Sequence, residues 1–114
     1  MVQTKTRTVP NTIREIVRPV QHAGFAARAL LCKEEGSPAD CCLAVIAPGS
    51  GGPSPSHTHS HDHIFFVLEG VARIEIDTEV FTVTANQAIH VPGLSLHSLW
   101  NRGEEELRLL SMNI

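Results

Sequence analysis

Val71-Ala72-Arg73-Ile74-Glu75-Ile76 is the stretch of sequence that decides the fold. Apolar residues at 72, 74 and 76 alternate with charged residues at 73, 75 and 77. Successive side chains of a β-strand point to opposite faces, so this alternation predicts a strand with one buried face. Glu69-Gly70 before it and Asp77-Thr78 after it are turn sequences, which bound the strand on both sides.

Short apolar segments of the same kind recur along the chain. Seven more have the length and composition of strands: 26–32, 41–47, 64–68, 80–83, 88–91, 96–100 and 107–110. Eight short strands separated by turn residues predict an all-β fold, an antiparallel sandwich or barrel. Residues 12–18 fit either a short helical turn or an edge strand. The Gly, Ser and Pro residues of 48–55 predict a loop around the mouth of the barrel.

Length and charge restrict the partners. The 114 residues suffice for one domain with its own hydrophobic core. Twelve acidic residues outnumber nine basic ones without any basic stripe, which argues against a nucleic-acid partner. No apolar run approaches the roughly 20 residues that span a bilayer, so we expect no membrane partner and a cytoplasmic protein. The odd number of cysteines, Cys32, Cys41 and Cys42, predicts reduced thiols.

Histidines are concentrated in one short segment. Four of the seven lie within His57-Thr58-His59-Ser60-His61-Asp62-His63, and His97 follows at a distance. Neutral imidazole is the commonest protein ligand for transition metals. The cluster therefore predicts a metal site.

Strand geometry restricts which of these histidines can share an ion. His57 and His59 would lie about 7 Å apart on one face of a strand, whereas His63 would lie roughly 20 Å from His57 if the strand ran straight. The chain must therefore turn within residues 60–62 to bring His63 back toward the same ion. This places His61 on the turn, where we expect it to face solvent.

The spacing of these residues resembles the first motif of the cupin family, G-x5-H-x-H-x3-4-E-x6-G. Gly51, His57, His59, His63 and Gly70 fall at the motif positions, with histidine in place of the glutamate at 63. The second motif of the family, G-x5-P-x-G-x2-H-x3-N, is matched by Pro92, His97 and Asn101.

Two positions of the second motif depart from the family. Asn86 stands in place of the first glycine, and Leu94 stands in place of the second. Of the residues other than glycine, asparagine is among those that most readily adopt a left-handed conformation. The two motifs together cover residues 51–101, about half of the chain.

The resemblance implies a small single-domain cupin of a four-histidine type. It implies an antiparallel jelly-roll barrel, also called a double-stranded β-helix, over residues 26–114. Residues 1–25 would form an N-terminal extension that contacts the partner in a homodimer. His57, His59, His63 and His97 would bind one divalent transition metal ion per chain, whether Fe, Mn, Zn, Ni or Cu. Four neutral ligands leave the ion its full charge and leave two octahedral positions open, which strengthens it as a Lewis acid.

Open positions on the ion favour a metal-dependent enzyme, dioxygenase-like, that acts on a small chelating substrate such as an enol, diketone or phenol. Apolar side chains are expected to dominate the barrel interior, which suits a small and partly apolar ligand: Ala44, Ile46, Phe65, Val67, Phe81 and Leu99. A metal-dependent isomerase or lyase is the alternative, as are a non-catalytic module that binds a metal or small ligand and an ion that only braces the barrel. The sequence assigns no catalytic residue beyond the metal ligands.

Overall fold

The computed structural model describes residues 16–17, 23–58 and 60–114, without the side chains of 16–17 and 54–57. Apart from a single 3-10 turn, every regular element in these ranges is a strand, so the predicted all-β class is confirmed. The elements are β1 (Ile16–Val17), β2 (Ala23–Leu31), η1 (Lys33–Glu35), β3 (Asp40–His57), β4 (His63–Glu69), β5 (Val71–Ile76), β6 (Glu79–Thr84), β7 (Ala88–Val91), β8 (His97–Asn101) and β9 (Leu107–Asn113).

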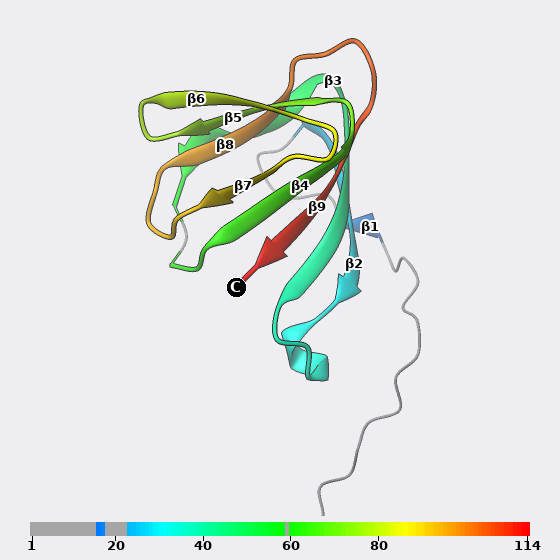
Figure 1. Cartoon of the computed structure of the whole chain (residues 1–114), viewed down its shortest axis with the longest axis vertical. Coiled ribbons are helices and arrows are strands. Elements are labelled where there is room, and N and C mark those ends of the chain that lie inside the picture. The colour runs from blue at the N-terminus through cyan, green and yellow to red at the C-terminus, as the bar shows by residue number, and fades with distance from the viewer. Residues whose placement is uncertain (1–15, 18–22, 59) are drawn as a thin grey trace, which may run out of the picture.

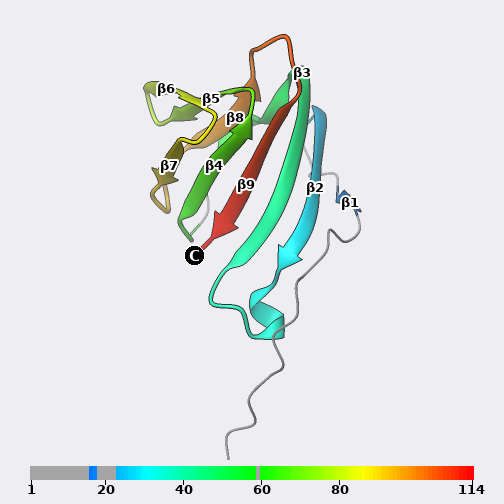
Figure 2. The same ribbon diagram turned by 45° about the vertical axis from the view of Figure 1, so that its right-hand side comes forward.

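The strands form two facing layers that make a nearly closed jelly-roll barrel (Figure 1). Their order is β6-β5-β8-β3-β9-β4-β7, with β2 beside β3 and β1 beside β2, and the pairings are antiparallel. The long strand β3 belongs to both layers. Its first half pairs with β2 and β9, and its second half pairs with β8 (Figure 2).

The Gly, Ser and Pro residues of 48–55 lie within β3, so the prediction of a loop there was wrong. Gly51 and Gly52 pair with Trp100 and Leu99 of β8. Gly51 has φ 145°, and a Cβ at this position would overlap the carbonyl oxygen of Leu99. Glycine is therefore required where the strand bends from one layer to the other and its backbone approaches β8 closely.

Apolar side chains from both layers fill the barrel. Ala72 and Ile74 of β5 are fully buried, as the alternation of that strand predicts. Of the side chains expected inside, Phe81 is half-buried against the core and the other five are buried. Burial of each large apolar side chain contributes roughly 1.5–3 kcal/mol, so this interior is the main source of stability.

The segment 12–18 includes an edge strand. Ile16 and Val17 form β1 and pair with Arg28 and Ala27 of β2. Residues 1–15 and 18–22 of the expected extension lie outside the described residues, and β2 begins at Ala23. Within the part of the chain that the structure describes, no helix is long and apolar enough to cross a membrane.

Candidate metal centre

The fold brings His63 and His97 together inside the barrel. His63 begins β4 in one layer, and His97 begins β8 in the other. The ring centroids are 4.9 Å apart with an interplanar angle of 64°. Both residues are buried, with 8% and 5% of their surface exposed. Two imidazoles from opposite layers therefore meet at one end of the core.

Backbone contacts orient the His97 ring. Its Nδ1–H donates to the carbonyl oxygen of Ser95 at 3.1 Å, since a carbonyl can only accept. In the neutral ring this places the lone pair on Nε2, which is the nitrogen that would coordinate an ion. The segment that leads into β8 is itself held, because Leu96 N–H donates to Asp77 Oδ1 at 3.0 Å and Asp77 N–H donates to the Leu96 carbonyl at 2.7 Å.

The other two predicted ligands are described less fully. The backbone of His57 lies directly opposite His97 in the pairing of β3 with β8, but its side chain is outside the described part. His59 lies outside the described residues altogether. Among the side chains that are described, no group of three or more His, Cys, Asp or Glu residues is placed to hold a metal ion. The four-histidine set therefore stays a prediction, with His63 and His97 placed next to each other.

His61 lies closer to this pair than the sequence analysis expected. The chain does turn at residues 60–62, as predicted, but His61 is half-buried rather than fully exposed. Its ring meets that of His63 edge-on at 4.7 Å. The contact arises from the turn itself, which no strand pattern in the sequence reports. Phe65, two residues further along β4, stacks on His63 at 5.5 Å, as the alternation predicts.

Asp62 ties the histidine-rich turn to the loop between β7 and β8. Its Oδ1 accepts from the Gly93 N–H and its Oδ2 from His90 Nε2, both at 2.7 Å. These two hydrogen bonds, that from His90 first, hold the pKa of Asp62 below its ordinary value. The carbonyl of Asp62 also accepts from the Ile114 N–H at 3.1 Å. The sequence alone does not place Asp62 and His90 in the site, because partners so distant in sequence leave no local pattern.

Both residues that replace a glycine of the second motif have a left-handed backbone. Asn86 adopts the left-handed conformation expected of it, with φ 68°, and Leu94 does the same with φ 70°. A Cβ on Gly93 would lie 2.8 Å from the carbonyl oxygen of Ser60. The glycine next to Leu94 therefore lets this loop approach the histidine-rich turn.

Asn101 closes the last turn of the second motif. Its Nδ2 donates to the carbonyls of Ile46 and Glu105 at 2.9 and 2.8 Å, and its Oδ1 accepts from the Gly103 N–H at 3.0 Å. The residue is completely buried. It therefore joins β8, β3 and the turn before β9 near the base of the core.

Comparison with known proteins assigns the family. Residues 42–113 match the cupin domain, which covers well over half of the chain. The chain is a cupin. A comparison with curated proteins finds no match.

Solved structures similar to this cupin include three of nearly the same extent. A predicted oxalate decarboxylase of Thermotoga maritima is 22% identical, with 94% of this chain and 98% of that chain covered and a TM-score of 0.78. The polyketide cyclase RemF of Streptomyces resistomycificus is 20% identical, with 96% and 79% covered and a TM-score of 0.76. A cupin-2 domain of Rhodospirillum rubrum is 18% identical, with 98% and 74% covered and a TM-score of 0.76. At these identities the likeness shows the fold alone.

Proposed function

We propose that this cupin binds one divalent transition metal ion through His57, His59, His63 and His97 and acts as a metal-dependent enzyme on a small chelating substrate. The observation that carries the proposal is the approach of the His63 and His97 rings to 4.9 Å from opposite layers. Buried imidazoles in such an arrangement suit a transition ion, and the hydrogen bond from His97 to Ser95 supports the coordinating tautomer.

The surroundings of the pair support this use. Phe65 covers one face of the His63 ring and keeps water from it. Asp62 accepts two hydrogen bonds that orient the turn beside His63, so we assign it a positioning role. A bound divalent ion supplies Lewis acidity and, for iron, manganese or copper, a redox centre. Cys41 and Cys42 are free thiols, which agrees with the reducing cytoplasm that we propose as the location.

Dioxygenase-like chemistry is the first candidate reaction, because four neutral ligands would leave open positions on the ion. A non-oxidative isomerase or lyase is the second, and the likeness to a polyketide cyclase favours it by analogy of fold. A module that binds the metal or a small ligand without converting it is the third.

Metal binding is tested by calorimetric titration of tag-free protein with Zn²⁺, Ni²⁺ and Mn²⁺. We expect His63→Ala and His97→Ala each to weaken binding at least tenfold. His90→Gln is the matched control, because it alters a histidine outside the predicted ligand set and keeps a hydrogen-bond donor for Asp62. Unchanged affinity in both alanine variants would overturn the metal site.

The reaction is tested by loading the protein with each candidate metal and adding a panel of enols, diketones and phenols. Oxygen consumption with a matching product supports the dioxygenase. A product formed without oxygen uptake favours the isomerase or lyase and rejects the oxygenase. Saturable binding with no product from any metal rejects the enzyme and leaves the binding module.

A further inference from the structure

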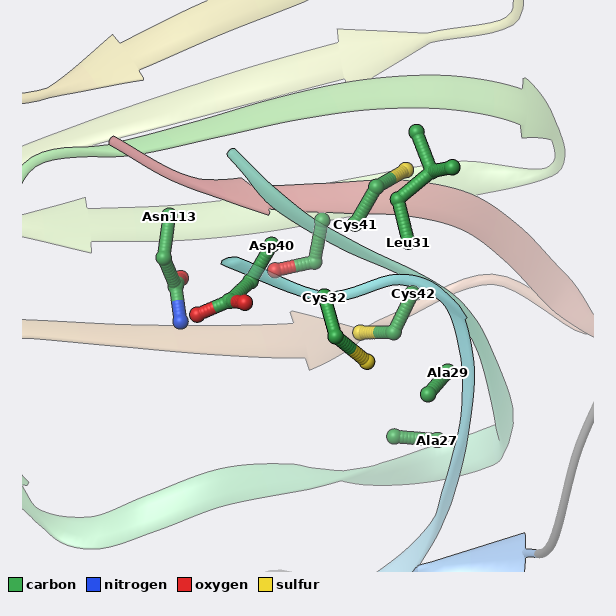
Figure 3. Close-up of a pocket in the computed structure, with 9 residues that line it drawn as sticks. Ala27, Ala29, Leu31, Cys32, Asp40, Cys41, Cys42 and Asn113 are labelled. Carbon is green, nitrogen blue, oxygen red and sulfur yellow. The ribbon is translucent and has the colours of Figure 1, made fainter. Parts of the chain in front are cut away.

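A cavity of about 260 Å³ opens between β2, β3 and β9 (Figure 3). Its walls come from three strands and from the residue that follows β2. The lining residues are Ala27, Ala29, Leu31, Cys32, Asp40, Cys41, Cys42, Ser111 and Asn113. The volume lies just below the roughly 300 Å³ at which typical small-molecule sites begin, so only a small ligand fits.

Strand register connects this cavity to the histidine pair. Asn113 is the partner of Asp40 on one side and of His63 on the other. Side chains of directly opposite residues point to the same face of a sheet. The part of the cavity formed by Asp40, Cys42, Ser111 and Asn113 therefore lies on the same face as His63, with Asn113 between them. Leu31 and Cys41 lie opposite each other at the other side of the strand ends.

The next rows of the sheet show that this face is the barrel interior. Ser111 lies between Cys42 and Phe65, and beyond it Leu109 lies between Ala44 and Val67. The deepest row is fully buried core. Along this face the side chains thus change from hydrocarbon to thiol and hydroxyl, and then to amide, carboxylate and imidazole at the open end.

The cavity lining carries negative charge and no positive charge. Asp40 is the one charged residue among the nine that line it. The Lys33 N–H donates to Asp40 Oδ1 at 2.7 Å, which fixes the carboxylate in place. Burial raises the pKa of Cys42, so this thiol stays neutral at physiological pH.

We propose that this cavity is the substrate site of the cupin and that it selects small, uncharged, largely apolar molecules with a hydroxyl group over their carboxylate counterparts. The apolar body packs against Ala27 and Ala29, which lie opposite Ala44 and Cys42 on the interior face. The hydroxyl donates to the carboxylate of Asp40 or to the amide oxygen of Asn113. A carboxylate ligand would instead meet Asp40 with no cation in the lining to pair with it, and an unpaired charge of this kind is costly to desolvate.

This inference rests on the proposed function for calling the ligand a substrate, but its test requires neither metal nor turnover. The probes are benzyl alcohol, benzoate and benzylamine, which share one ring and differ in charge. They are titrated into ¹⁵N-labelled full-length protein, as purified and again after dialysis against chelator. We expect benzyl alcohol to shift the amide signals of Ala29, Ser111 and Asn113 and to bind at least tenfold more tightly than benzoate.

Variants then locate the effect. Asp40→Asn should reduce the preference for benzyl alcohol over benzoate to threefold or less. Ala29→Leu should fill the cavity and weaken benzyl alcohol binding at least tenfold. Ala26→Leu makes the same change on the same strand but on the opposite face, and it should bind benzyl alcohol as the wild type does. The amide spectrum of each variant verifies that it is folded.

Three outcomes would overturn the inference: benzoate binding as tightly as the alcohol, benzylamine binding more tightly than the alcohol, or shifts confined to residues outside the cavity. Failure of the proposed function looks different. If metal binding is absent and the alcohol still binds selectively here, the selectivity stands and the metal enzyme does not. If metal binds through His63 and His97 and the probes do not discriminate, the metal site stands and the selectivity of the cavity does not.

Discussion

Leu94 occupies a position where the cupin motif carries glycine, yet its backbone is left-handed. With φ 70° and 75% of its surface exposed, it has strain without much compensating burial. A left-handed conformation costs an L-residue with a Cβ roughly 1–2 kcal/mol. The loop between β7 and β8 therefore keeps the shape that glycine would favour, and the cost falls on one exposed leucine.

Leu94→Gly should increase the free energy of unfolding by about 1 kcal/mol, because the relief of left-handed strain exceeds the added freedom of the unfolded chain. Urea unfolding followed by tryptophan fluorescence measures the change. Leu96→Gly is the matched control, since Leu96 is also an exposed leucine before β8 but has no positive φ. That variant should be destabilised, and a gain in both variants would contradict the role of strain.

The thiol of Cys42 should react with iodoacetamide only at higher pH than an ordinary thiol. Burial is the main reason, and the neighbouring Cys41 adds to it. The folded state therefore keeps the Cys42 proton to a higher pH than the unfolded state does. Its contribution to stability is present below the ordinary thiol pKa and is lost as the pH rises through the raised value. Peptide-resolved mass spectrometry across neutral to alkaline pH, with urea-unfolded protein as control, measures the shift. Equal profiles would contradict it.

At the scale of elements, the sequence predicts strands well where one face of the strand is buried and the other is exposed to solvent. The alternation in β5 and the turns around it predicted a strand over residues 71–76, and the observed strand has the same bounds. The prediction failed in the second half of β3, because the glycines and prolines there were interpreted as loop residues. Their close approach to β8 depends on a strand about fifty positions away, which no local pattern reports. The same holds for the contacts of Asp62 with His90 and Gly93.

The tie between the β3–β4 turn and the β7–β8 loop can be tested one hydrogen bond at a time. In Asp62→Ala, the Gly93 amide loses its acceptor and should exchange with solvent at least severalfold faster. The Ile114 amide donates to the Asp62 main-chain oxygen, so it should keep its rate. Hydrogen exchange by NMR measures both amides. His90→Ala, which removes the other partner of Asp62, should leave Gly93 protected, and an unchanged Gly93 rate in Asp62→Ala would disprove the tie.

At the scale of the whole molecule, the outer faces of the two layers differ in polarity. In β5 the outward residues are Val71, Arg73 and Glu75, and the last two form an ion pair at 3.1 Å. Apart from Arg108 opposite Val45 and Glu69 beside it, the outward side chains of β3, β4 and β9 are mainly apolar and half-buried, with Leu43 the most buried: Leu43, Val45, Ile64, Phe66, Leu110 and Met112. A sheet that is apolar on both faces is covered on both, whereas a solvated face is polar.

We expect this apolar face to pack against the same face of a second copy, which gives the homodimer expected from the sequence. Light scattering at micromolar concentration should give twice the chain mass of 12.4 kDa. Phe66→Glu should dissociate the dimer, because it would bury a charge opposite Leu110. Thr82→Glu, on an exposed position of β6, should not. A wild-type protein that is monomeric would refute the pairing.

In the metal site proposed above, the placement of His63 and His97 in opposite layers would let the interior packing control the size of the ion from a distance. Phe65 and Leu99 lie one step deeper along the same two strands, and both belong to the packed interior. The thickness of that packing sets how far apart the two rings stand. If the pair binds the proposed ion, exchanging an interior side chain for a slimmer or bulkier one should therefore change the preference between small and large cations without altering any of the four histidines.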